Sequence, residues 1–361
     1  MAVELSKFLN SRFADESVLG PLRARFQSAE PFPWLVLEDF LTRGFVDRLV
    51  TDFPQKGPSY DKYCLGEDGK ICPNYANPNP KEFPEAFQLL DSLISSDEFV
   101  TFLSKLTGIP DLEYDPDYFG GGIRESQSQV YLPPHIDFNY HPRNLSHRRL
   151  NLLVYLNEDW MEEWGGAIQV HKDPRVHRTD SMVASFPPVL NRCFIFETSE
   201  RSWHGFNRLV PPPGRSRRAF TVYYYTKDRP DADDVSLHNT EYVEPPLPAR
   251  FAAGHTLTGE DELLLTEAIV RRDARIELLY RIRAEADGKY AHLWKEYEYY
   301  LDLSRSLRNE LDSVRAAAAQ TGEDVQIGPQ TAHGSSSIRA IRALTDRVIS
   351  LRPVWRRSTG R

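Results

Sequence analysis

The amino-acid sequence predicts an α+β protein, with a sandwich or barrel of short strands in mid-chain, supporting helices before it and a long helix after it. Three observations lead to this class. Short apolar segments separated by Gly, Pro and Asn turns fill residues 120–228, a pattern typical of sandwiches and barrels. Apolar residues recur at helical spacing within 85–108, which indicates amphipathic helices. A heptad series of apolar residues follows at 265–314, which indicates a long helix.

The N-terminal part is expected to support the strand region. Residues 31–56 predict a strand that leads into a helix, and residues 85–108 predict one or two helices that end at Gly108 and back the sheet. Residues 57–80 are rich in Gly, Pro and Asn and predict an exposed loop. That loop either covers a substrate pocket or is only surface.

The central strands are short and separated by turn residues. We predict strands at 129–132, 150–156, 167–170, 193–197 and 219–226. The first domain is therefore expected to span 1–250, with its core at 100–230.

Composition excludes several classes of protein. The formal net charge of −8 argues against a nucleic-acid-binding protein. Three cysteines, Cys64, Cys72 and Cys193, fit neither a disulfide framework nor a thiolate metal site. The N-terminus resembles no secretory signal, and no run of apolar residues is long enough to cross a membrane. We expect a soluble, cytoplasmic protein.

His135, Asp137 and His204 have the chemistry of a metal site. Residues i and i+2 of a strand point the same way, so His135 and Asp137 can bind one ion together. His204 would have to return on a neighbouring strand. Two imidazoles and one carboxylate can occupy one face of an octahedral metal, as in the facial triad of non-heme Fe(II) oxygenases. The alternative is that all three are hydrogen-bonded polar residues on a sheet edge.

A strand with cations at its start follows the second histidine. After the turn at 211–216, Arg217 and Arg218 begin the strand. Adjacent strand residues point to opposite faces, so only one of the two can enter the barrel. A planar guanidinium there can hold a dicarboxylate through a bidentate pair.

Taken together, these pieces carry a family resemblance. The segment from about 102 to 230 resembles an Fe(II)- and 2-oxoglutarate-dependent oxygenase of the prolyl-hydroxylase-like type. The matching pieces, in chain order, are 120–122, 135–142, 148–157, 164–166, the His204 segment and the Arg217 strand. The resemblance implies a double-stranded β-helix, a jelly-roll or cupin-like core, that uses Fe(II), 2-oxoglutarate and O2, with ascorbate as an optional reductant.

The resemblance also implies roles for single residues. In that family the 2-oxoglutarate anchor is an Arg two positions before a small residue, so Arg217 with Ala219 is favoured over Arg218. Tyr131 and Asn151 are candidate contacts to 2-oxoglutarate, although a buried Tyr or Asn is also often satisfied within a core.

The implied activity is hydroxylation of an unactivated C–H bond, with release of succinate and CO2. Halogenating relatives replace the carboxylate ligand with a small residue, whereas Asp137 is intact. The substrate can be a small metabolite, a sugar or polysaccharide precursor, or a prolyl or other peptidyl side chain. Two other classes stay open: a non-catalytic jelly-roll binding module with a vestigial triad, and a coiled-coil scaffold that carries the oxygenase domain along. Succinate formation separates the enzyme from both.

The region 257–318 is predicted to be a long helix or coiled coil. Steps of four and three residues connect Leu265, Ile269, Arg272, Ile276, Leu279, Arg283, Ala286, Tyr290, Leu293, Tyr297, Tyr300, Ser304, Leu307, Leu311 and Val314. A helix over 260–318 would be roughly 90 Å long. It either associates with a second copy, folds into a hairpin at Gly288, or docks on another protein.

The last part of the chain, 319–361, is predicted to be a linker and a tail. Residues 320–337 are polar and rich in Gly and Ser, as in flexible linkers. Residues 338–357 combine a helical apolar face with several arginines. Such a segment either binds an anionic membrane surface or a protein partner, or is a solvated basic tail.

Overall fold

The structure is a computed structural model that describes residues 4–54, 61–62, 74–230, 237–244, 246–248, 250–251 and 253–321. It divides into two units, Met1–Arg272 and Asp273–Arg361. Most of the predicted loop at 57–80, nearly all of the predicted linker at 320–337 and the whole basic segment at 338–357 lie outside the described residues.

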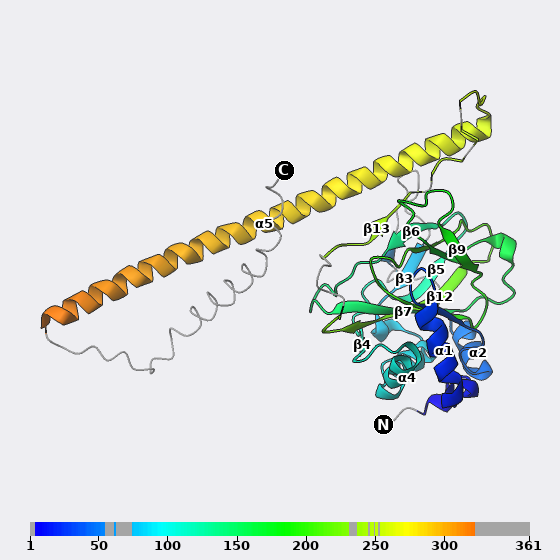
Figure 1. Ribbon diagram of the computed structural model, residues 1–361, viewed down its shortest axis with the longest axis horizontal. Helices are drawn as coiled ribbons and strands as arrows, with labels where there is room; N and C mark the ends of the chain where they lie inside the picture. Colours follow the sequence, from blue (N-terminus) through cyan, green and yellow to red (C-terminus); the bar gives the residue numbers. More distant parts are fainter. Residues whose placement is uncertain are drawn as a thin grey trace. The chain divides into compact units, whose positions relative to one another are not determined.

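Two antiparallel sheets form the centre of the first unit (Figure 1). The larger sheet has the order β1-β10-β7-β12-β5-β3-β2, with β4 also paired to β12, and the smaller has the order β13-β6-β11-β8-β9. The strands of the larger sheet are β1 (Trp34–Leu37), β2 (Asp61–Lys62), β3 (Asn74–Asn77), β4 (Glu113–Tyr114), β5 (Gly122–Ser126), β7 (His147–Tyr155), β10 (Cys193–Glu197) and β12 (Arg217–Thr226). Those of the smaller sheet are β6 (Leu132–Ile136), β8 (Ile168–His171), β9 (Met182–Phe186), β11 (His204–Phe206) and β13 (Glu241–Tyr242).

From β5 onward the chain passes back and forth between the two sheets, as in a jelly roll. The central order of the larger sheet is β5-β12-β7-β10, and that of the smaller sheet is β6-β11-β8-β9. Within each sheet, strands that are far apart in sequence are therefore neighbours. The predicted jelly-roll core with helices is therefore confirmed.

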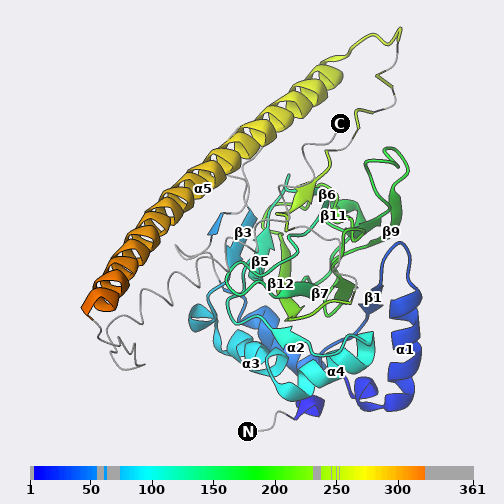
Figure 2. The same ribbon diagram turned by 60° about the vertical axis from the view of Figure 1, so that its left-hand side comes forward.

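Helices cover one face of the larger sheet, as Figure 2 shows. They are α1 (Glu16–Ser28), α2 (Arg43–Thr51), α3 (Glu85–Ile94) and α4 (Asp97–Thr107), with short 3-10 turns at Leu5–Lys7, Ser11–Ala14, Pro80–Glu82 and Glu162–Trp164. The α4 helix begins where the Ser96 hydroxyl accepts a hydrogen bond from the Phe99 amide, and it ends at Gly108, whose φ of +81° suits glycine. The helices predicted over 85–108 are α3 and α4.

Alternation along β12 separates the helix-facing core from the interior between the sheets. Phe220, Val222 and Tyr224 belong to the cluster that packs against the helices. Ala219 belongs to a second buried cluster, between the two sheets. Because side chains alternate along a strand, Arg217 shares the inner face with Ala219, whereas Arg218 points to the helix side.

The long helix α5 (Gly259–Thr321) is continuous through Gly288 (Figure 1). The hairpin alternative at Gly288 is therefore not what the structure shows. At its start, the Thr258 amide donates to the Asp261 carboxylate at 3.0 Å, and the Asp261 amide donates to the Thr258 hydroxyl at 3.2 Å, which is a capping box. None of the described helices is long and apolar enough to cross a membrane.

Candidate metal centre and co-substrate pocket

The structure brings His135, Asp137 and His204 together at the smaller sheet. β6 and β11 are antiparallel neighbours, and His204 lies directly opposite His135. Asp137 follows the end of β6, and its carboxylate oxygens lie 3.8 Å from Nε2 of His135 and 3.6 Å from Nε2 of His204. The three potential ligand atoms lie within 4.8 Å of one another. This spacing suits coordination of one ion.

Backbone carbonyls set the tautomer of both imidazoles. Nδ1 of His135 lies 2.9 Å from the carbonyl oxygen of Pro133, and Nδ1 of His204 lies 2.8 Å from that of Ser202. A carbonyl only accepts, so each Nδ1 carries the hydrogen and each Nε2 presents a lone pair. Burial, together with the neighbouring His204, lowers the pKa of His135 to about 3, and burial also lowers the pKa of His204. Both rings are therefore neutral, as metal ligation requires.

Two side chains of β7 fix the position of the Asp137 carboxylate. Its Oδ2 atom accepts a hydrogen bond from the Asn151 amide at 2.7 Å and lies 3.1 Å from the Arg148 guanidinium. Burial by itself raises the pKa of Asp137, but the charge of Arg148 and the hydrogen bond from Asn151 outweigh it and hold that pKa below its usual value. The carboxylate is therefore ionised.

Arg148 is a buried positioning residue that the sequence interpretation did not single out. Its guanidinium lies 3.6 Å from the centre of the Tyr223 ring and 4.3 Å from that of Phe138, and its Nε donates to the Asn151 side-chain oxygen at 2.9 Å. The rings and Asn151 fix the guanidinium in place against Asp137. The sequence signal that could have identified Arg148 is a charged residue at the start of a strand whose other residues are mostly apolar.

Arg217 is a buried cation inside the jelly roll. Its Nε donates to the Gly166 carbonyl at 2.9 Å, and its Nη2 donates to the Tyr155 hydroxyl at 3.1 Å. The Phe206 ring lies 4.4 Å away, and burial lowers the pKa of the guanidinium. Among the described residues no carboxylate forms an ion pair with Arg217, so the pocket suits an anionic ligand.

The other predicted residues make different contacts. Arg218 lies on the helix side, 3.8 Å from Glu125 and over the Phe53 ring. The Tyr131 hydroxyl accepts a hydrogen bond from Arg271. The Asn151 amide is directed at the Asp137 carboxylate, as described above. The roles of Tyr131 and Asn151 toward 2-oxoglutarate stay predictions.

A second cluster, Asp115, Asp117 and His141, has metal-ligating residue types but a different tautomer. Nε2 of His141 lies 3.4 Å from Asp115 and 3.6 Å from Asp117. Nδ1 of His141 accepts a hydrogen bond from the Arg143 amide at 3.3 Å. In the neutral ring the hydrogen is then on Nε2 and faces the carboxylates. This imidazole is arranged to donate rather than to ligate.

Tyr242 is a further neighbour of the metal centre that the sequence did not reveal. It lies on β13, which follows the last core strand and pairs with β6. The Tyr242 ring stacks on His135, with ring centres 5.1 Å apart. The chain after the jelly roll therefore returns to cover a proposed metal ligand.

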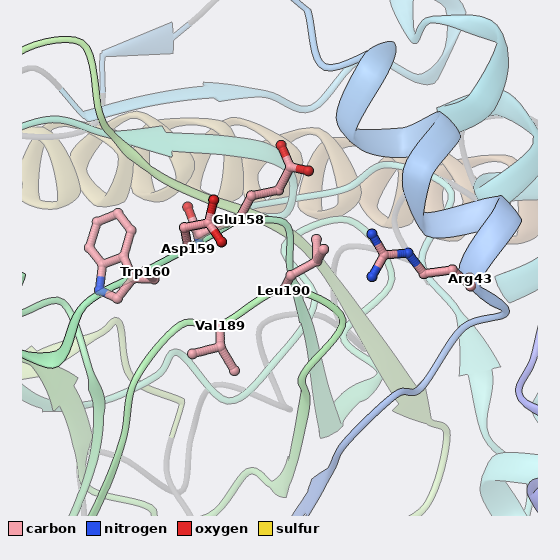
Figure 3. A pocket seen from close by; sticks show the side chains of 7 residues that line it. Arg43, Glu158, Asp159, Trp160, Val189 and Leu190 are labelled. Carbon is pink, nitrogen blue, oxygen red and sulfur yellow. The ribbon is translucent and has the colours of Figure 1, made fainter.

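One surface cleft lies away from the proposed metal site. It has a volume of about 340 Å³ and lies between Arg43 of α2 and the segments around Trp160 and Leu190 (Figure 3). It contains neither the three proposed ligands nor Arg217. A second cleft of about 210 Å³ is lined partly by Trp203, beside His204.

One comparison with known protein families agrees with this chemistry. A model of the 2OG-Fe(II) oxygenase superfamily matches residues 122–225. Among solved structures, a prolyl hydroxylase from Trichoplax adhaerens, in complex with a hypoxia inducible factor peptide, is similar at 16% identity and a TM-score of 0.42, over 59% of this chain and 90% of that one. A prolyl-4-hydroxylase from Pseudomonas putida is similar at 18% identity and a TM-score of 0.41, over 57% and 98%.

A third similar structure is HygX from Streptomyces hygroscopicus with nickel and 2-oxoglutarate bound, at 14% identity and a TM-score of 0.39, over 62% of this chain and 96% of that one. The comparison with curated protein sequences gave no match.

Proposed function

We propose, from the match of residues 122–225 to a model of the 2OG-Fe(II) oxygenase superfamily, that His135, Asp137 and His204 hold the Fe(II) and that Arg217 anchors 2-oxoglutarate. The superfamily is one of enzymes that use Fe(II), 2-oxoglutarate and O2. The proposal extends to the reaction: hydroxylation of a C–H bond of the substrate, with release of succinate and CO2.

One observation carries the metal assignment. Both imidazoles present an unprotonated Nε2 to the same carboxylate, because both Nδ1 atoms are committed to backbone carbonyls. Two nitrogen lone pairs that point at a carboxylate repel it, so this arrangement would not help a cluster that only stabilises the fold. A cation bound between the three side chains makes the same arrangement favourable. The neighbouring His141 cluster, with the opposite tautomer, provides the contrast.

The protein residues have separate tasks. Bound Fe(II), with 2-oxoglutarate and O2, supplies the oxidising chemistry. Arg148 and Asn151 keep the Asp137 carboxylate ionised and oriented. Arg217 offers a fixed charge for a carboxylate in an interior lined by Tyr155 and other buried side chains, where the low dielectric strengthens the pair. The stacked Tyr242 ring shields one face of His135 from water.

Metal binding is tested with Asp137→Ala against Asp117→Ala as the matched control. Both changes remove a carboxylate that lies within 4 Å of an imidazole. After anaerobic reconstitution, Asp137→Ala should lose stoichiometric iron and the conversion of 2-oxoglutarate to succinate, whereas Asp117→Ala should keep both. Normal iron content and turnover in Asp137→Ala would refute the assignment.

The co-substrate anchor is tested in the same assay. Arg217→Leu removes a charge-assisted contact of about 2 to 3 kcal/mol, so the KM for 2-oxoglutarate should rise roughly 30- to 150-fold. Arg218→Leu, on the opposite face of the same strand, should change it little. The reverse result would mean that Arg218 carries the role.

A further inference from the structure

A short segment after the jelly roll covers the proposed metal ligand His135. We call residues 237–244 the strap; they contain β13, which is the edge strand of the smaller sheet beside β6 (Figure 1). Tyr242 of the strap lies directly opposite His135, and the two rings stack with their planes 25° apart. Only 4% of His135 is exposed. The strap is therefore part of what separates this ligand from solvent.

The backbone holds the strap weakly. β13 is only two residues long, which is shorter than most strands. In the same register the next pair is Val243 with Pro134, and the Val243 amide donates to the Pro134 carbonyl at 2.8 Å. A hydrogen-bonded antiparallel pair normally has two such bonds, but proline has no N–H to donate the second. Local opening of the strap should therefore cost much less free energy than global unfolding.

Side chains supply a latch at the start of the strap. Nε2 of His238 lies 3.0 Å from the Glu200 carboxylate, and the His238 amide donates to the Asn139 side-chain oxygen at 3.1 Å. Asn139 lies two positions after Asp137, and Glu200 lies four positions before His204. The latch therefore joins the strap to both segments that carry the proposed metal ligands.

The remaining ion pairs of the strap are longer. Glu241 lies 3.7 Å from Arg175, and both side chains are about half exposed. Glu244 lies 3.9 Å from Arg271, which is beyond hydrogen-bond distance. Such pairs stabilise little. The latch at His238 and the stacked Tyr242 ring are therefore the main side-chain contacts that keep the strap closed.

We propose that the strap is a gate for the metal ion, which enters and leaves beside His135 when the strap opens by local unfolding. The inference rests on the proposed metal centre. The contacts that close the strap involve no metal-binding atom, so they form equally with and without the ion. They therefore set how fast the metal exchanges and leave its Kd unchanged.

The first test weakens the latch in the full-length protein. His238→Ala should raise the rate of Mn(II) uptake and the rate of Mn(II) release to excess EDTA by the same factor, about two- to fivefold. The Kd from equilibrium titration should stay unchanged. His177→Ala is the matched control, because it also removes an imidazole near a carboxylate, Asp180 at 3.8 Å, but outside the strap. It should change neither rate.

The second test removes the cover itself. Tyr242→Ala should raise both rates about three- to tenfold, because the stacked ring no longer favours the closed strap. Tyr242→Phe keeps the ring and should stay close to the wild type. Hydrogen exchange of the Val243 amide in the metal-free protein reports on opening without any metal. In His238→Ala it should accelerate by the same factor as the metal rates.

The outcomes separate a gate from a support for the ligand. Faster release without faster uptake, and hence a higher Kd, would overturn the gate, because the strap would then act only on the metal-bound state. Equal rates in His238→Ala and His177→Ala, or unchanged exchange at Val243, would also overturn it. A wild-type protein that binds no Mn(II) would refute the proposed metal centre on which the inference rests.

Discussion

Replacing Arg148 should destabilise the metal-free protein about twice as much as the metal-bound protein. The Arg148 side chain is only 1% exposed, and its Nη2 lies 3.1 Å from the Asp137 carboxylate. In Arg148→Met the new side chain fills the space of the aliphatic part of Arg148, but the buried Asp137 carboxylate loses its compensating positive charge. A metal ion bound at Asp137 supplies that compensation instead.

The size of the effect follows from the distance. Two unit charges 3.1 Å apart attract by about 5 kcal/mol at an effective dielectric constant of about 20. Removing one partner of a buried pair costs about 3 to 5 kcal/mol. We expect a loss of that size in the free energy of unfolding without metal, and about half of it with saturating Mn(II), because the cation then offsets the charge of Asp137.

Urea unfolding with and without Mn(II) measures both values. Arg149→Met is the matched control: it is the next residue on the strand, and it loses a 2.9 Å ion pair with Glu197 rather than with a proposed metal ligand. Its loss of stability should not depend on Mn(II). If Arg148→Met lost the same amount with and without metal, the proposed electrostatic link between Arg148 and the metal site would be wrong.

Three further outcomes are expected. Gly166→Ala should raise the KM for 2-oxoglutarate, because φ at Gly166 is +74° and the new Cβ would lie 3.1 Å from Cδ of Arg217; an unchanged KM would contradict this. Burial lowers the pKa of His238, but Glu200, 3.0 Å away, outweighs it and the net pKa is raised. The pair therefore stabilises below the unfolded histidine pKa of about 6.5, and this contribution is lost as the pH rises through the folded pKa. Glu200→Gln should then lower the melting temperature more at pH 5.5 than at pH 8.5, and an equal loss at both would count against the pair. A chain that ends at Arg272, the last residue of the first unit, should keep iron binding and succinate formation, and loss of both would show that the rest of α5 completes the catalytic domain.

The local sequence pattern was sufficient to predict those elements whose residues repeat with a helix or strand period. The helical spacing at 85–108 predicted α3 and α4, and alternation predicted that Arg217 and Arg218 face opposite sides of one strand. The edge strand β9 (Met182–Phe186) was not predicted. Its side chains are mostly exposed, so it has no contrast between a buried and a solvent face from which a strand can be recognised.

The sequence by itself determined the residue types of the site and the spacing of His135 and Asp137, because a two-residue repeat is a local property of the backbone. Only the tertiary structure decided which strands are neighbours, and therefore that Arg148 and Asn151 of β7 hold Asp137 and that Tyr242 of β13 covers His135. Such contacts join positions far apart in the chain, and they depend on the packing of two whole sheets. A periodic pattern of residues within one segment contains no information about that packing.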